Sequence, residues 1–284
     1  MDIGMELTYL AVGVVGGAMV GVGNYVTERC GFHLCHWLKE RQLVSRLSRT
    51  RCSELCAHPA SNACTVGLPY VILYWSVARS WGGADGFGRK MSLDIDLTYI
   101  CLFTWAAMVV HDAWFYLVHS GFHWHKPLYT KFHALHHSNG ACISALGTAY
   151  GEAVDVGLCF VAFHAILFWV LKGLPSWNLP AVVVLISFEV ATNVTGHCGY
   201  QLPLWLHALV TGGVGLTPFA ATSRTHYIHH LDPRVNKGLY FTWWDRLAGT
   251  YADEHVLCLK ARQGGPAPSC EQVGYARPVD SIVH

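Results

Sequence analysis

The 284-residue chain has few charged residues. Asp, Glu, Lys and Arg together make up 13% of it, whereas about 25% is usual in soluble domains. Hydrophobic residues account for 52%, so apolar side chains stand where a soluble protein carries charge. The composition therefore predicts a membrane protein and excludes a disordered chain.

Other signatures are also missing. The formal net charge is only +1, without the excess of positive charge that nucleic-acid-binding proteins carry, so we expect no nucleic-acid partner. The eleven cysteines follow no regular spacing, and no pair of C-x-x-C motifs indicates a zinc ribbon or a redox dithiol. No G-x-G-x-x-G motif follows a predicted strand, and no haem-binding or flavin-binding domain is recognisable.

Apolar runs dominate the chain. A helix of about twenty residues crosses the hydrocarbon core of a bilayer, and the shorter second run needs flanking aromatic residues as interface anchors. We expect the first run to be an anchor rather than a cleaved signal peptide, since Asp2 and Glu6 precede it and no small-residue cleavage site follows. The sequence thus predicts an all-α integral membrane bundle with four or five spans, at residues 7–26, 63–77, 97–118, 154–171 and 179–194.

The loops between these runs differ in positive charge. Fifteen of the nineteen Lys and Arg residues fall in segments 29–62 and 119–152 and after residue 223, which one topology places on the same side. The positive-inside rule makes that side cytosolic. We expect three parts: a membrane anchor at 1–92 with two spans and a basic cytosolic loop, a histidine-rich domain at 93–255, and a flexible tail at 256–284. Residues 202–216 are amphipathic and predicted to lie in the interface.

Histidine is the abundant polar residue, with eighteen copies. Positions i, i+3 and i+4 of a helix share one face, so a cluster at this spacing aims its rings at a common point. Three such clusters and one further histidine border the apolar runs, and leaving so many buried rings without a metal would be costly. Nine ligands suit two metal ions, with iron as the first candidate and zinc as the alternative. The nine are His119, His123, His133, His136, His137, His197, His226, His229 and His230.

Other polar residues in the apolar runs are candidates for orienting these ligands. Glu189, Asn193 and His197 are spaced by four and so share one helix face, and a carboxylate inside a membrane run is a functional hypothesis by default. We predict that Asn193, Glu189, Asp112 and His111 lie behind the ligands. Glu152 and Asp155 carry the same hypothesis, and simple helix packing is the alternative for all of them.

The order of the histidine motifs resembles that of a known family. An H-x-x-x-H box, an H-x-x-H-H box, an H-x-G-Y segment and a second H-x-x-H-H box follow one another, and the segment from Asn236 to Thr250 reads NKGLYFTWWDRLAGT. This pattern, over residues 112–251, is similar to the fatty acid hydroxylase and sterol desaturase superfamily. Ser120 and Ala248 depart from it where Arg or Lys and Phe are common, which affects the expected substrate subclass and no ligand.

The resemblance implies a function and its partners. The nine histidines would hold two irons at the cytosolic face of the endoplasmic reticulum membrane, and residues 93–255 would be the catalytic domain. The activity implied is use of dioxygen to hydroxylate or oxidise a lipid C–H bond, with no catalytic residue beyond the metal ligands. Electrons would come from NAD(P)H through a reductase and cytochrome b5, since this chain shows no fused electron carrier.

Alternatives to this reading are of two kinds. Within the superfamily, a sterol or methylsterol is the first substrate, and a fatty-acyl or sphingolipid hydroxylase or desaturase is the alternative. Outside it, the chain could be a non-catalytic metal-binding membrane protein or a metal transporter. A transporter would have histidines lining the spans, whereas the clusters in this sequence flank them.

Overall fold

A computed structural model describes residues 3–41, 43–47, 59–81, 89–138 and 143–253. Helices dominate these residues, and the only regular sheets among them are two pairs of two-residue strands. The predicted all-α class is therefore confirmed. The predicted tail at 256–284 lies outside the described residues, as do residues 42 and 48–58 of the predicted basic loop. Residues 29–40, predicted to begin that loop, are helical.

Four helical segments are long and apolar enough to cross a membrane. They are α1 (Ile3–Glu40), α4 (Leu97–Trp124), α9 (Leu179–His197) and the segment Ala153–Gly173, which comprises α7 (Ala153–Val156), the π-helical turn η4 (Gly157–Val161) and α8 (Ala162–Gly173). Large apolar side chains on them point away from the protein, including Leu7, Leu102 and Trp169, each more than 60% exposed. Such a surface suits lipid rather than water.

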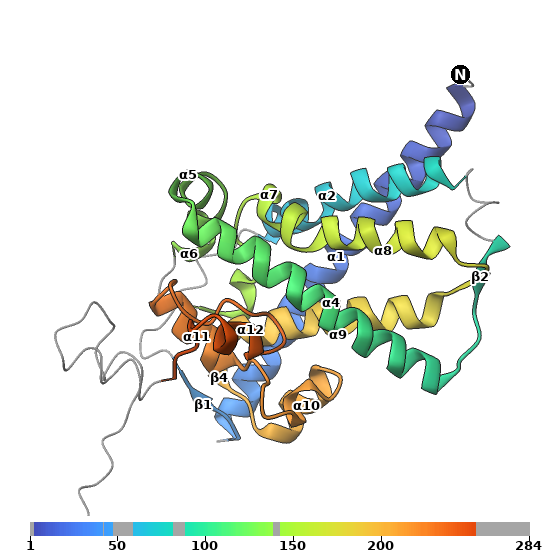
Figure 1. Ribbon diagram of the computed structural model, residues 1–284. Coiled ribbons are helices and arrows are strands. Elements are labelled where there is room, and N and C mark those ends of the chain that lie inside the picture. The colour runs from blue at the N-terminus through green and yellow to red at the C-terminus, as the bar shows by residue number, and fades with distance from the viewer. Residues whose placement is uncertain (1–2, 42, 48–58, 82–88, 139–142, 254–284) are drawn as a thin grey trace, which may run out of the picture.

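The short second run forms α2 (Pro59–Ser80), which packs along α1 (Figure 1). Glycines make this close packing possible. A Cβ atom added at Gly17 would lie 2.7 Å from the carbonyl oxygen of Gly67, and one added at Gly13 would lie 2.7 Å from that of Val71. Small residues that let two helix backbones approach are typical of helix pairs in membranes.

The elements that carry the histidine clusters gather at one end of the bundle, where Figure 1 shows α6 (Ala134–His137) and α11 (Ser223–Leu231) together with the short α5 (Lys126–Leu128). At the opposite end, β2 (Met91–Ser92) pairs in parallel with β3 (Trp177–Asn178). Near the histidines, β1 (Ser45–Arg46) pairs antiparallel with β4 (Tyr200–Gln201). This second pair ties the chain after α1 to the chain after α9.

Side-chain caps fix where the main helices begin. The Asp96 carboxylate accepts a hydrogen bond from the backbone N–H of Tyr99 at 3.1 Å and starts α4. Asn178 caps α9 through the N–H of Ala181 at 2.8 Å. Thr222 and Thr225 form a reciprocal capping box at the start of α11. Because a cap satisfies backbone donors that a helix start otherwise leaves unpaired, these residues set the register of the helices.

Two further segments complete the fold. The predicted interfacial segment forms α10 (Leu204–Val210) and the short 3-10 turn η5 (Val214–Leu216), separated by Gly212 and Gly213 in the left-handed region. Its membrane location stays a prediction. Farther along, residues 239–241 pack on α4, with Tyr240 and Phe241 in one buried cluster with Met108, Phe115 and Phe122. That cluster fixes the segment that follows α11 against α4, the helix that carries the first histidine box. The segment leads into α12 (Trp243–Leu247).

The contact between α1 and α2 yields a stability prediction. Gly17→Val would place a side chain against the backbone of α2, and we expect it to cost about 1–3 kcal/mol, the usual range for overpacking. The measurement is the thermal midpoint of the full chain in detergent. Gly23→Val on the same helix is the control, because nothing lies within 4 Å of a Cβ atom there. Equal midpoints for the two variants would contradict the close packing.

Candidate metal centre

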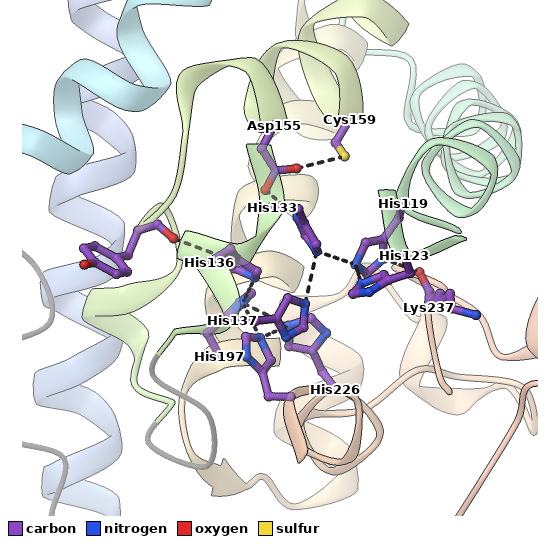
Figure 2. Close-up of polar contacts among 12 residues, drawn as sticks. His119, His123, His133, His136, His137, Asp155, Cys159, His197, His226 and Lys237 are labelled. Carbon is purple, nitrogen blue, oxygen red and sulfur yellow. Dashed lines mark hydrogen bonds and ion pairs between the residues drawn. The ribbon is translucent and has the colours of Figure 1, made fainter. Parts of the chain in front are cut away.

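All nine predicted histidines lie close together. His119 and His123 stand in the last two turns of α4, and His197 is the last residue of α9. His133 ends the π-helical turn η2 (Tyr129–His133), directly before α6, which carries His136 and His137. The remaining three are on α11. Figure 2 shows histidine rings from these elements turned toward one another. The helical spacing therefore does aim the boxes at a common region.

The nine rings form two groups. Within each group the candidate ligand nitrogens lie within 4.8 Å of one another. The groups adjoin, since the ring centroids of His137 and His230 are 4.6 Å apart. The first group is His119, His123, His133, His137 and His229, and the second group is His136, His197, His226 and His230.

Each H-x-x-H-H box contributes to both groups. His133 and His137 belong to the first group, while His136 between them belongs to the second. On α11 the assignment is reversed, because His226 and His230 belong to the second group and His229 to the first. Successive residues of an α-helix point about 100° apart, so two adjacent histidines on one helix can serve two neighbouring positions.

Hydrogen bonds fix the outer nitrogen of five of these rings. Carbonyl and carboxylate oxygens accept hydrogen bonds and do not donate them. A neutral ring that is hydrogen-bonded to such an oxygen through Nδ1 therefore carries its N–H proton on Nδ1 and has a lone pair on Nε2. The five contacts are His119 to the Lys237 carbonyl at 2.8 Å, His133 to the Asp155 carboxylate at 2.7 Å, His136 to the Tyr150 carbonyl at 3.2 Å, His197 to the Asn193 carbonyl at 2.8 Å and His229 to the Val235 carbonyl at 2.7 Å.

The inner nitrogens of these rings then face one another without protons between them. Nε2 of His119 lies 3.1 Å from Nε2 of His133, and Nε2 of His197 lies 3.1 Å from that of His136. Nε2 of the buried His229 has no hydrogen-bond partner among the described residues. Two facing lone pairs repel, and a cation shared between them turns the repulsion into ligation. The donor set therefore fits metal ions.

Burial favours the neutral form of several of these rings. Burial, with a smaller electrostatic contribution from the neighbouring His133, lowers the pKa of His136 to about 4. Burial likewise holds the pKa values of four further rings outside the spans well below the ordinary value for histidine: His137, His226, His229 and His230. Metals bind the neutral imidazole, so these five rings are in the binding form at neutral pH.

The segment from Val235 to Phe241 supplies two of the five acceptors and is itself held in place. The Asp112 carboxylate accepts hydrogen bonds from the backbone N–H groups of Leu239 and Tyr240, at 3.1 and 2.7 Å. Asp245 accepts from the N–H of Lys237 at 2.9 Å. Thus Asp112, one of the residues predicted to lie behind the ligands, reaches the first group through this segment.

Glu189 and His111 contact a different set of residues. Glu189 forms an ion pair with His111 and lies 2.9 Å from Nε2 of His164, whose Nδ1 is 2.7 Å from the Tyr70 hydroxyl. These residues form a buried polar cluster inside the bundle, outside the two histidine groups. Asn193 contacts a predicted ligand, but through its backbone carbonyl rather than its side chain.

Among the described residues, Asp155 is the side chain with a carboxylate in direct contact with a predicted ligand, His133. The sequence offered one signal for it, a carboxylate inside an apolar run, yet the same signal applied to Glu189 and Asp112. Figure 2 shows Asp155 beside His133, with its other oxygen toward the thiol of Cys159. The backbone acceptors at Tyr150, Val235 and Lys237 have no sequence signal, because any residue presents a carbonyl.

A cavity adjoins the two groups. His119, His136 and His197 line one part of it, and apolar residues including Val20, Val66 and Ile186 line the rest, with Asn24, Tyr70 and Glu189 among them. The cavity thus runs from the histidines into the bundle between α1, α2 and α9. An apolar hollow with few polar groups is typical of a small-molecule site.

Comparison with known proteins gives consistent similarities. The family model described as fatty acid hydroxylase matches residues 104–250. The chain is 27% identical to methylsterol monooxygenase 1 of Rattus norvegicus over 55% of its length and 49% of the relative. It is 31% identical to sphinganine C4-monooxygenase 1 of Arabidopsis thaliana, over 51% and 52%, and 28% identical to the very-long-chain aldehyde decarbonylase GL1-9 of Oryza sativa subsp. indica, over 56% and 57%.

The chain thus spans about half the length of the curated relatives it matches. No solved structure matches it. The residues that the family model matches, 104–250, fall inside the predicted domain 93–255. The boundaries of that domain stay a prediction.

The contact between Asp155 and His133 yields a prediction for metal binding. We expect Asp155→Ala to weaken metal binding by the first group about 10–100-fold, because outer partners of ligating histidines contribute that much. The measurement is anaerobic titration of the metal-free full chain with Zn²⁺. Glu152→Ala is the control, since Glu152 is exposed three residues away. Unchanged affinity in the Asp155 variant would remove its orienting role.

Proposed function

This chain belongs to the fatty acid hydroxylase family, and we propose on that premise that it is a membrane-bound non-haem diiron oxygenase of lipids. The observation that carries the proposal is the pairing of inner nitrogens at 3.1 Å, with their protons held on the outer side of each ring. Two such groups beside an apolar cavity suit two metal ions and a lipid chain. Iron is the proposed metal, and zinc is the alternative that the same ligands accept.

The reaction we propose replaces a lipid C–H bond by C–OH. One oxygen atom of dioxygen enters the product and the other leaves as water, with two electrons and two protons consumed. Bound iron would supply the activation of dioxygen. The proposed ligands of the first iron are His119, His123, His133, His137 and His229, and those of the second are His136, His197, His226 and His230.

The chain's own residues provide orientation and exclusion of water. The Asp155 carboxylate and four backbone carbonyls hold ring protons away from the metal positions. Val20, Val66 and Ile186 give the adjoining cavity an apolar wall, which suits a hydrocarbon chain and keeps bulk water from the site.

We propose a sterol or methylsterol as the substrate, with a fatty-acyl or sphingolipid substrate as the alternative. Relatives named methylsterol monooxygenase and sphinganine C4-monooxygenase support both classes. The proposed location is the endoplasmic reticulum membrane with the histidines at the cytosolic face, supported by the uneven distribution of Lys and Arg. The proposed electron source is NAD(P)H, through cytochrome b5 and its reductase.

Reconstitution tests this function. The purified full chain is loaded anaerobically with Fe²⁺, supplied with cytochrome b5, its reductase, NADH and dioxygen, and offered methylsterol, sphinganine and fatty-acyl substrates in separate vesicles. We expect one oxidised lipid by mass spectrometry. His136→Ala should lower the rate by more than about 100-fold, beyond the cost of losing an outer partner.

His33→Ala is the matched control, because His33 is exposed on α1 and belongs to neither group. It should retain the full rate. A chain that binds iron yet oxidises none of these lipids would favour a non-catalytic metal-binding protein instead. Equal rates in the two histidine variants would show that any lipid oxidation does not depend on the proposed iron site.

A further inference from the structure

A buried carboxylate lies on α1, outside the residues that the family model matches. Glu28 is 1% exposed in the middle of this apolar helix. Its carboxylate accepts hydrogen bonds from the side-chain amides of Asn24 at 3.0 Å and Asn62 at 3.1 Å. It also accepts one from the backbone N–H of Ala149, at 3.0 Å and 121 residues away in sequence.

Asn62 on α2 contacts the same loop. Its amide donates to the carbonyl of Leu146 at 2.8 Å, and the side chain is 1% exposed. Glu28 and Asn62 therefore hold both a donor and an acceptor of residues 145–151, which we call loop 145–151. Loop backbone groups buried in a membrane protein need such partners, and here two helices of the N-terminal segment supply them.

Loop 145–151 in turn contacts the second histidine group. The Tyr150 carbonyl, next to Ala149, accepts the Nδ1 proton of His136 at 3.2 Å. A Cβ atom added at Gly151 would lie 3.5 Å from Cβ of His136. The acceptors for the first group are elsewhere, at Asp155, Val235 and Lys237. The path from Glu28 thus leads to one ring of one group.

Holding α1 against α2 does not require this carboxylate. The two helices already meet through the glycine contacts at Gly13 and Gly17. A buried carboxylate is costly, and an ionisable residue inside a membrane segment is by default a candidate for function. At Glu28 the acceptor of a long-range backbone hydrogen bond is next to the residue that orients His136.

We propose that Glu28 is a positioning residue for the second histidine group, acting through loop 145–151 on His136. The inference rests on the proposed pair of metal positions. It gives α1 a part in metal binding besides anchoring the chain in the membrane. Asn62, which holds the same loop from α2, shares this role.

The experiment measures each metal position separately, in the metal-free full chain in lipid nanodiscs, with Zn²⁺ as the probe. His123→Ala impairs the first group, so titration in that background reports the second. There, adding Glu28→Ala should weaken Zn²⁺ binding about 10–100-fold, the range for an outer partner of a ligating histidine. In a His226→Ala background, which reports the first group, the same change should alter binding less than about threefold.

Glu40→Ala is the matched control, because Glu40 is an exposed carboxylate on the same helix. It should leave both affinities unchanged. If Glu28→Ala loses its helical circular dichroism, Glu28→Gln carries the test, since it keeps the side-chain size and loses one acceptor oxygen. It should weaken the second group selectively. Equal changes in both groups, or none, would overturn the proposal.

Zinc binding needs no turnover, so the titration tests the positioning role of Glu28 independently of the proposed oxygenase activity. A chain with the selective effect of Glu28 and no lipid oxidation would keep the positioning role and lose the oxygenase. A chain that oxidises lipid at the same rate and binds both ions equally well with Glu28→Ala would keep the oxygenase and lose the positioning role.

Discussion

A neutral imidazole carries one N–H proton, on either of its two ring nitrogens. The arrangement of the histidine groups in this protein depends on which nitrogen carries that proton. An oxygen acceptor behind each of five rings holds the proton outward and leaves a lone pair inward. Four of the acceptors are backbone carbonyls, so their positions are set by loops and helix ends rather than by residue type. The segment after α11 and loop 145–151 are therefore as much a part of the site as the histidine boxes.

Buried carboxylates fix those loops. Asp112 binds the backbone at 239–240, Asp245 binds it at Lys237, and Glu28 binds it at Ala149. Glu28 and Asp112 join parts of the chain that are 121 and 127 residues apart in sequence, whereas Asp245 closes a local turn, and each of the three carboxylates accepts from several N–H donors. The apolar bundle supplies the rigid frame, and these few acids set the relative positions of the loops at its end.

The nine histidines were predictable from the sequence because their spacing follows the helical repeat. Four spans were predictable because their hydropathy marks them. The division into two groups could not be predicted, since each H-x-x-H-H box contributes to both groups and the pairing depends on how α4, η2, α6, α9 and α11 meet in space. Asp155, Glu189 and Asp112 looked alike as carboxylates in apolar runs, yet they contact a ligand, two other histidines and a backbone segment respectively. Glu28 lies just past the predicted first run, and its partner at Ala149 is visible only in the fold.

The sharing of each H-x-x-H-H box between the two groups has an evolutionary consequence. Turning or shifting either helix to improve the rings of one group moves a ring of the other. The two histidine groups therefore cannot be retuned independently of each other by changes in these helices. Apolar residues of the cavity wall such as Val20, Val66 and Ile186 lie on neither of these two helices, so changes there can alter the shape of the cavity and leave both histidine groups in place.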